Sequence, residues 1–257
     1  MHLHLPEIDE FAHLNSPIHS WDARVKIISL LGLIISVVLL DRILLAFFGL
    51  SFCIILVFIS KIPLRFLFAY LKWVLLFALF FAIIMPLTAP GDEIASFDFL
   101  SVSKEGVLLA ILIVLRATSA ALLVFLMIGT AELSVTMKAL GELKVPNKLI
   151  QIFMFAYRYI FIFIEEVEKM FTAAKARAFK EKTNIQTLKI VGFILGMLFV
   201  KSYERSRRVY NAMVARGYTG RLKILHEFHL GRKDFIRGFI ILGFAILLQI
   251  LAYRFRH

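Results

Sequence analysis

Long runs of apolar residues constrain this chain more than any other feature. A bilayer core offers no water to backbone N–H and C=O groups, so an apolar run of about 18 residues or more is typical of a spanning helix. Hydrophobic residues make up 60% of the 257 residues, 26 residues are phenylalanine, and the mean hydropathy is +0.84. The pattern predicts an all-α integral membrane protein with about five transmembrane helices, at 27–40, 43–60, 64–86, 107–129 and 235–253.

The first two runs are expected to form two short helices rather than one long helix. Residues 27–60 number 34, and a single helix of that length would be about 51 Å long, well beyond the roughly 30 Å of a bilayer core. The polar pair Asp41 and Arg42 interrupts the runs, and Pro63 ends the second because proline cannot continue a helix. The single cysteine lies inside the second run, so no disulfide is expected. The polar first 26 residues do not resemble a cleavable signal peptide.

The distribution of charge predicts which side of the membrane each segment faces. Residues 130–234 hold 19 Lys and Arg against nine Asp and Glu, a net charge of +10, whereas the loop between Pro86 and Gly106 carries −3. By the positive-inside rule, the basic region and the N-terminus lie in the cytosol. The predicted organisation is a cytosolic N-terminal segment (1–26), a four-helix transmembrane region (27–129), a cytosolic or interfacial region (130–234), and a final transmembrane helix with the C-terminus (235–257).

Two apolar stretches within the basic region leave the number of crossings open. Residues 149–164 contain two polar side chains, and residues 188–200 number only 13. We expect both stretches to belong to long amphipathic helices at the membrane interface, because two further crossings would place the basic segment 169–182 outside. A seven-span protein is the alternative. Arg254 and Arg256, near the C-terminus, argue mildly against five crossings.

The basic region also contains an internal repeat. Residues 171–179, Phe-Thr-Ala-Ala-Lys-Ala-Arg-Ala-Phe, align without a gap with residues 210–218, Tyr-Asn-Ala-Met-Val-Ala-Arg-Gly-Tyr, at an offset of 39. Each copy ends a helical stripe in one arginine, Arg177 or Arg216, flanked by small residues. Small neighbours let a partner's backbone approach, and a guanidinium can pair bidentately with a carboxylate in the partner's groove. Two copies predict a dimeric or pseudo-dimeric partner; the alternative is two solvated or lipid-facing arginines.

Taken together, these segments resemble the CbiQ/EcfT family, the transmembrane T components of energy-coupling-factor (ECF) transporters. The two repeat copies are similar to the family's paired Ala-Arg-Gly motifs. Residues 16–26, which include Asp22 and Arg24, are similar to its N-terminal segment. Arg116 in the fourth span and Arg158, which stands between two tyrosines, also fit the family as intramembrane or supporting residues.

The sequence departs from the family pattern at two positions. The first motif reads Ala176-Arg177-Ala178, with alanine in place of the glycine, whereas the second reads Ala215-Arg216-Gly217. Ala23 also replaces the family's usual proline. Because the first motif keeps its arginine, its departure bears on close packing at that helix more than on docking itself.

The resemblance implies a non-catalytic, multi-pass subunit of the prokaryotic cell (inner) membrane that transmits force. Its cytosolic coupling helices would engage two cytosolic ATPase subunits, and a separate membrane subunit would bind the substrate, cobalt or nickel rather than a vitamin. The chain has no Gly-x-x-x-x-Gly-Lys-Ser/Thr loop, so ATP hydrolysis is expected in the partners. Coupling requires contacts that differ between the nucleotide states, and Arg177 and Arg216 are the candidates for them.

Other classes of function find less support in the residues. No carboxylate pair, Cys/His cluster or nucleophile–base arrangement is readable, so no catalytic residue, cofactor or metal ligand is predicted and a membrane enzyme is disfavoured. Anionic lipid is a nearer polyanion for the basic region than nucleic acid. A self-contained permease or channel is the principal alternative. Arg116 is costly within a span and is expected to have either a structural partner or a transport role.

Overall fold

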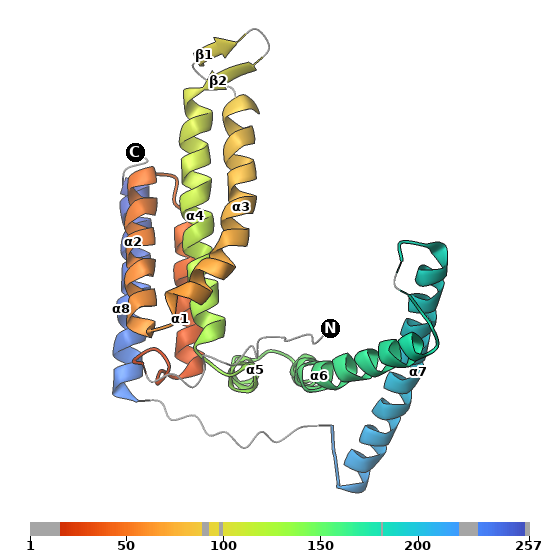
Figure 1. Ribbon diagram of the computed structural model, residues 1–257. Helices are drawn as coiled ribbons and strands as arrows, with labels where there is room; N and C mark the ends of the chain where they lie inside the picture. Colours follow the sequence, from red (N-terminus) through yellow and green to blue (C-terminus); the bar gives the residue numbers. More distant parts are fainter. Residues whose placement is uncertain (1–15, 89–92, 98–99, 181, 221–230, 255–257) are drawn as a thin grey trace. The chain divides into compact units, whose positions relative to one another are not determined.

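A computed structural model describes residues 16–88, 93–97, 100–180, 182–220 and 231–254. The described residues form two compact units, a bundle within 1–139 and 226–257 and a crossed-helix unit within 140–225 (Figure 1). The bundle contains α1 (Ala23–Val38), α2 (Ile43–Ser60), α3 (Leu64–Thr88), β1 (Glu93–Phe97), β2 (Leu100–Ser103), α4 (Lys104–Gly129) and α8 (Arg232–Arg254). Helix α5 (Leu133–Glu142) leads into the crossed-helix unit, which contains α6 (Asn147–Ala176) and α7 (Ile185–Ala215).

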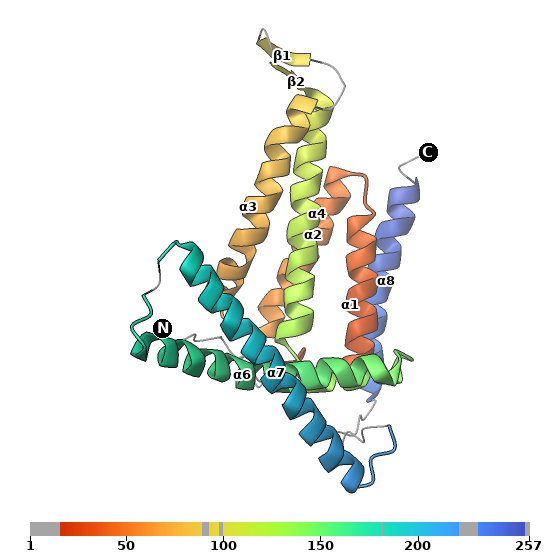
Figure 2. The ribbon, with the colours of Figure 1, turned by 90° about the vertical axis from the view of Figure 1, so that its right-hand side faces the viewer.

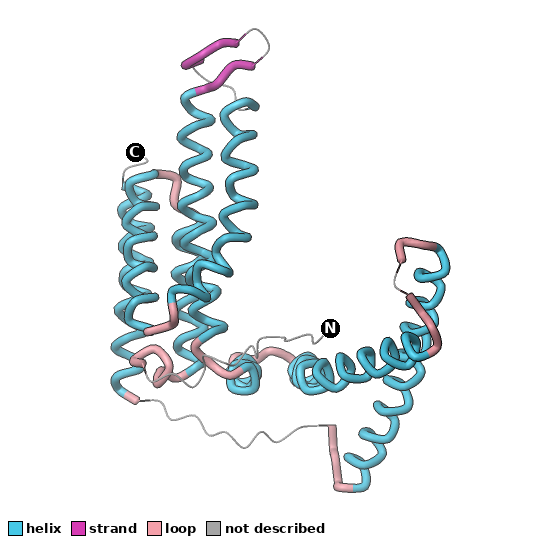
Figure 3. Tube along the Cα trace, in the orientation of Figure 1, coloured by secondary structure: helices cyan, strands magenta, loops and turns pink. Residues whose placement is uncertain are grey.

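The predicted all-α membrane fold is confirmed, with one small addition. Helix α1 ends at Val38 and α2 begins at Ile43, so the chain turns where the sequence places Asp41 and Arg42. Helix α2 ends before Lys61, whose φ of 57° closes the helix in the left-handed region. An antiparallel hairpin of β1 and β2, which the sequence analysis did not predict, joins α3 to α4 (Figure 3). Its strands have five and four residues, too few to give a periodic signal.

Five described helices, α2, α3, α4, α7 and α8, are long and apolar enough to cross a membrane. The number agrees with the prediction, but one member differs. Helix α1, expected as a span, has only 16 residues, or about 24 Å, which is less than the roughly 30 Å of a bilayer core. Helix α7, expected at the interface, qualifies because its apolar first half continues without a break into a 31-residue helix.

Helix α1 belongs to the bundle core because it packs closely against α8. A Cβ added to Gly238 of α8 would lie 2.5 Å from the Val25 side chain, so only glycine allows this approach. The Ser36 hydroxyl donates to the Ala245 carbonyl at 2.8 Å, and the Gln249 amide donates to the Ser36 carbonyl at 2.7 Å. Small residues and polar cross-links of this kind are typical of helix pairs in membranes, where the hydrophobic effect does not hold helices together.

The segment before α1 and the first turn of α1 are tied to two distant helices of the bundle. The Trp21 indole N–H donates to the Asp234 carbonyl of α8 at 3.2 Å. The buried Lys26 ammonium donates to the carbonyl and the hydroxyl of Thr130, the C-cap of α4, both at 3.0 Å. Asp22 is the N-cap of α1, and its carboxylate accepts a bond from the Arg24 backbone N–H at 2.9 Å. These residues of the N-terminal segment therefore help to hold the bundle together.

Replacing Asp22 by alanine is expected to lower the free energy of unfolding by about 1 kcal/mol, the usual cost of losing an N-cap. Burial raises the pKa of this carboxyl, but the hydrogen bonds and charge of Arg24 outweigh burial and hold the pKa below its ordinary 3.8. Because the folded-state pKa is depressed, the cap contributes fully above the unfolded pKa and its contribution is lost as pH falls through the folded value. Thermal unfolding in detergent, compared at neutral and acidic pH, should show the two proteins converging in acid; a constant difference would contradict this.

Candidate functional site

The internal repeat of the sequence corresponds to two whole helices of the crossed-helix unit. A shift of 39 residues carries α6, at 147–176, onto residues 186–215 of α7. Both helices also carry the same exposed i,i+4 ion pair, each with an N–O distance of 3.8 Å, Glu165–Lys169 in α6 and Glu204–Arg208 in α7. The nine-residue match seen in the sequence is therefore the C-terminal end of a 30-residue structural repeat.

Both motif arginines are helix C-caps rather than residues of the helix body. Helix α6 ends at Ala176, and helix α7 ends at Ala215. After Arg177, the Phe179 N–H donates back to the Ala174 carbonyl at 3.1 Å and the Ala178 N–H to the Lys175 carbonyl at 3.0 Å. The second copy repeats this pattern at 3.0 and 2.9 Å, with Tyr218 and Gly217 as the donors. Each motif is thus a Schellman cap, which turns the chain sharply out of the helix.

The cap geometry explains the glycine of the second motif and the departure in the first. Gly217 has φ of +80° and Ala178 has φ of +62°, both in the left-handed region that favours glycine. A Cβ added to Gly217 would meet no described atom within 4 Å. Within this chain the requirement is therefore one of backbone conformation, and the effect of the alanine on close packing at that helix stays a prediction. The alanine keeps the cap at some cost in strain.

Single substitutions at these two positions are expected to change the free energy of unfolding in opposite directions. Replacing Ala178 by glycine relieves the left-handed alanine, and replacing Gly217 by alanine introduces one, so each should shift the unfolding free energy by about 1 kcal/mol. Hydrogen exchange at the amides of the last turn of α6 should slow in the first variant, and exchange at the last turn of α7 should quicken in the second. Shifts of the same sign in both would show that the cap conformation does not govern these positions.

The two arginine side chains are exposed, and neither forms a hydrogen bond or ion pair with another residue in the described part of the chain. Each stands at a helix C-terminus, where the helix dipole favours a cation. A guanidinium presents five donors in a planar fork, which a carboxylate matches with two parallel bonds. Arg177 and Arg216 are therefore available to an acidic partner.

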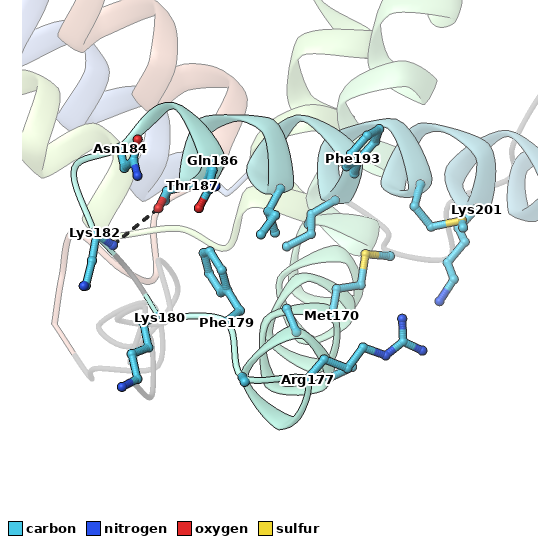
Figure 4. A pocket seen from close by; sticks show the side chains of 16 residues that line it. Met170, Arg177, Phe179, Lys180, Lys182, Asn184, Gln186, Thr187, Phe193 and Lys201 are labelled. Atoms are coloured by element: carbon cyan, nitrogen blue, oxygen red, sulfur yellow. Dashed lines mark hydrogen bonds between the residues drawn. The ribbon is translucent and has the colours of Figure 1, made fainter.

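The two helices cross in antiparallel fashion (Figure 2). Two grooves lie between them. The first groove, of about 870 Å³, lies between the end of α6 and the start of α7 and has Arg177 on its rim (Figure 4). The second, of about 520 Å³, lies between the first half of α6 and the end of α7. The 39-residue shift relates the linings, since Met170, Ala174 and Ile194 of the first groove correspond to Val209, Met213 and Phe155 of the second. The unit is therefore pseudo-twofold in its construction.

The two ends of the unit are anchored by different chemistry. The Tyr218 hydroxyl donates to the Gln151 side-chain oxygen at 2.5 Å, and the Gln151 amide donates to the Gly220 carbonyl at 2.9 Å. These bonds tie the end of α7 to the start of α6. The equivalent aromatic residue of the first copy, Phe179, instead lines the first groove. Gln151 is one of the two polar side chains that interrupt the apolar stretch 149–164, and a lone amide in such a stretch is the sequence signal for a contact of this kind.

An ion pair joins the two helices beside the first groove, which Lys201 lines. The Lys201 ammonium of α7 donates to the Glu166 carboxylate of α6. The hydrogen bond from Lys201, opposed by some desolvation and assisted by the nearby charges of Lys169 and Arg205, lowers the pKa of Glu166. The carboxylate is therefore ionised at neutral pH and contributes to fixing the register of the crossing.

The remaining residues singled out in the sequence lie apart from the motifs. Arg116, at the middle of α4, forms an ion pair with Asp41 of the turn between α1 and α2, with an N–O distance of 3.1 Å. Asp22 and Arg24 pair with each other at the start of α1. Arg158 is exposed on α6 and forms no ion pair with another described residue. Arg116 thus has the structural partner that was one of its two expected roles.

No group of three or more His, Cys, Asp or Glu side chains could hold a metal ion in the part of the chain that the structure describes. Of the histidines near the N-terminus, His19 forms a hydrogen bond between its Nδ1 and the Ser16 hydroxyl at 2.6 Å. His2, His4 and His13 lie outside the described residues.

Comparison with known proteins identifies related sequences over most of the chain. Residues 14–229 match the CbiQ family, described as cobalt transport protein. An uncharacterised protein of Methanocaldococcus jannaschii is 30% identical, over 96% of this chain and 85% of its own length. The energy-coupling factor transporter transmembrane protein EcfT of Acidaminococcus fermentans is 27% identical, over 93% and 94%. The cobalt transport protein CbiQ of Rhodobacter capsulatus is 27% identical, over 50% and 52%.

Proposed function

The chain belongs to the CbiQ family of cobalt transport proteins, and we propose that it is the transmembrane coupling subunit of an energy-coupling-factor importer. The observation that carries this proposal is the pair of matched helix ends, each of which presents one exposed arginine on a Schellman cap. Two equivalent ends on one chain suit two equivalent grooves on a dimeric partner. Two cytosolic ATPase subunits are the partner proposed, with Arg177 and Arg216 docking one each.

The proposed mechanism converts closure of the ATPase pair into motion of the coupling helices. Only contacts that differ between the nucleotide states can shift a conformational equilibrium. The two caps lie at the far ends of helices that are joined at their crossing by Glu166 and Lys201. When the ATPases close on ATP, the docked ends are drawn together and α6 and α7 turn about this crossing. A separate membrane subunit that binds the substrate is then reoriented by the moving helices.

The division of labour leaves this chain without catalysis or substrate specificity of its own. ATP hydrolysis belongs to the ATPase subunits, and recognition of cobalt or nickel belongs to the substrate-binding subunit. The cell (inner) membrane of a prokaryote is the proposed location, with the basic coupling region on the cytosolic side. The apolar helices of the bundle support a multi-pass arrangement in the bilayer.

The test is affinity purification of the full chain from native membranes in mild detergent, with identification of bound proteins by mass spectrometry. We expect two ATPase copies and one small hydrophobic subunit. The metal that this hydrophobic subunit binds would identify the transported substrate. Recovery of the chain alone, under conditions that keep an unrelated multi-subunit transporter of the same membranes assembled, would contradict the proposal. That result would favour a self-contained permease.

A further inference from the structure

The groove between the end of α6 and the start of α7 combines two kinds of surface. Lys180 and Lys182 lie at one end of the groove, and Arg177 and Lys201 lie at the opposite end (Figure 4). Phe179 lies between the two ends. We propose that this groove binds an anionic phospholipid, with the phosphate held by Lys180 and Lys182 and one acyl chain lying along the apolar floor. The inference does not depend on ATPase docking and goes beyond the proposed coupling role.

The polar end of the groove offers donors to a phosphate. Beside the two lysines, the lining includes the side chains of Asn184, Gln186 and Thr187, and it includes no carboxylate among the described residues. Glu181 lies outside the described residues, and with its charge counted the segment 175–182 still carries a net charge of +3. The Lys182 backbone N–H donates to the Thr187 hydroxyl at 3.4 Å, which holds the lysine segment against the first turn of α7. Positive charge in excess, next to a membrane helix, attracts anionic headgroups.

The floor of the groove is apolar and continues into exposed apolar surface on α7. Met170, Phe179 and Ile190 line the floor, and Phe193 and Met197 extend it while remaining 67% and 53% exposed. At the start of the same helix, Ile185 is 79% exposed and Leu188 is 71% exposed. Exposed apolar surface of this extent is expected to contact an apolar partner. Helix α7 is one of the helices long and apolar enough to enter a bilayer. Lysines beside an apolar helix face are typical of segments that lie at the headgroup boundary.

The second groove provides an internal comparison within the same unit. Its pseudo-twofold construction is the same, but its described lining is largely aromatic, and its only described cation is Arg205. At the positions that the 39-residue shift relates to Lys180 and Lys182, the second copy has Thr219 and Arg221, and Arg221 lies outside the described residues. Among the described residues, a lysine pair lines the groove beside the apolar half of α7 and no lysine lines the second groove. A lipid with a charged head and an apolar tail fits the first groove.

The experiment uses the full chain with its co-purifying subunits, exchanged into detergent containing equal amounts of phosphatidylglycerol and phosphatidylcholine, and measures bound lipid by native mass spectrometry. The test variant is Lys180→Gln with Lys182→Gln. The matched control is Lys148→Gln with Arg207→Gln, which removes two exposed cations of α6 and α7 outside the groove. Each basic side chain near an anionic lipid changes affinity about fivefold, so the test variant should bind phosphatidylglycerol about 30-fold more weakly.

Further arms separate a lipid from other occupants. A short-chain phosphatidylglycerol should bind more weakly than the long-chain form, and Phe193→Asn should weaken only the long-chain form. Equal loss of lipid in the test and control variants, or displacement of the lipid by excess inorganic phosphate, would overturn the proposal. So would an unchanged preference for phosphatidylglycerol in the test variant. The same spectra record whether the ATPase subunits remain bound, so failure of the lipid site is distinguishable from failure of the coupling role.

Discussion

Replacing both Arg177 and Arg216 by alanine is expected to abolish co-purification of the ATPase subunits. Each arginine is proposed to enter a partner groove and pair with a carboxylate, and removal of one partner from such a pair typically costs about 3 kcal/mol. Loss of both would weaken the complex by about 6 kcal/mol, or on the order of 10⁴-fold. Either single variant should retain enough affinity to assemble but should transport poorly, because one ATPase subunit would no longer move its helix.

The control variant loses the same amount of charge at positions away from the caps. Lys189→Ala with Arg207→Ala removes two exposed cations of α7 that lie outside the two arginine caps. This variant should hold its ATPase subunits as the unaltered chain does. Co-purification and uptake of labelled cobalt into vesicles would be measured for all five proteins: the unaltered chain, the two single variants, the double variant and the control. Intact ATPase binding by the double cap variant would disprove the docking role of the two arginines.

Replacing Trp21 by alanine is expected to destabilise the bundle by about 3–5 kcal/mol, the range for loss of a large buried aromatic side chain. Trp21 is only 5% exposed, its indole N–H donates to the Asp234 carbonyl, and its ring packs beside Gly238. The variant would lose this packing and would remove the indole donor from the Asp234 carbonyl at the start of α8. Thermal unfolding followed by circular dichroism in detergent would measure the change.

Trp21→Phe separates the two contributions. Phenylalanine retains most of the apolar contact and lacks only the N–H donor, so it should cost about 1–2 kcal/mol. The order of stability expected is therefore the unaltered chain, then Trp21→Phe, then Trp21→Ala. A loss in the alanine variant no larger than that in the phenylalanine variant would show that the hydrogen bond, and not the packing, holds the N-terminal segment to α8.

The sequence alone determined the features that depend on local pattern. Apolar runs specify helices in a membrane because no other local structure satisfies the backbone there. The break at Asp41 and Arg42 and the stop at Pro63 follow from polar and proline residues at single positions, and the structure confirms both. The repeat around Arg177 and Arg216 was also readable, because the two copies keep the same residue types at the same spacing.

The tertiary structure decided everything that depends on which helices meet. No periodic pattern of the sequence encodes the left-handed backbone angles at Ala178 and Gly217. Nor does such a pattern encode which distant side chains meet, as Tyr218 meets Gln151 and Arg116 meets Asp41. The span prediction differed from the structure at α1 and α7 for a related reason. Apolar content sets whether a helix can enter lipid, but the length of the continuous helix, and the helices against which it packs, are fixed only when the chain folds.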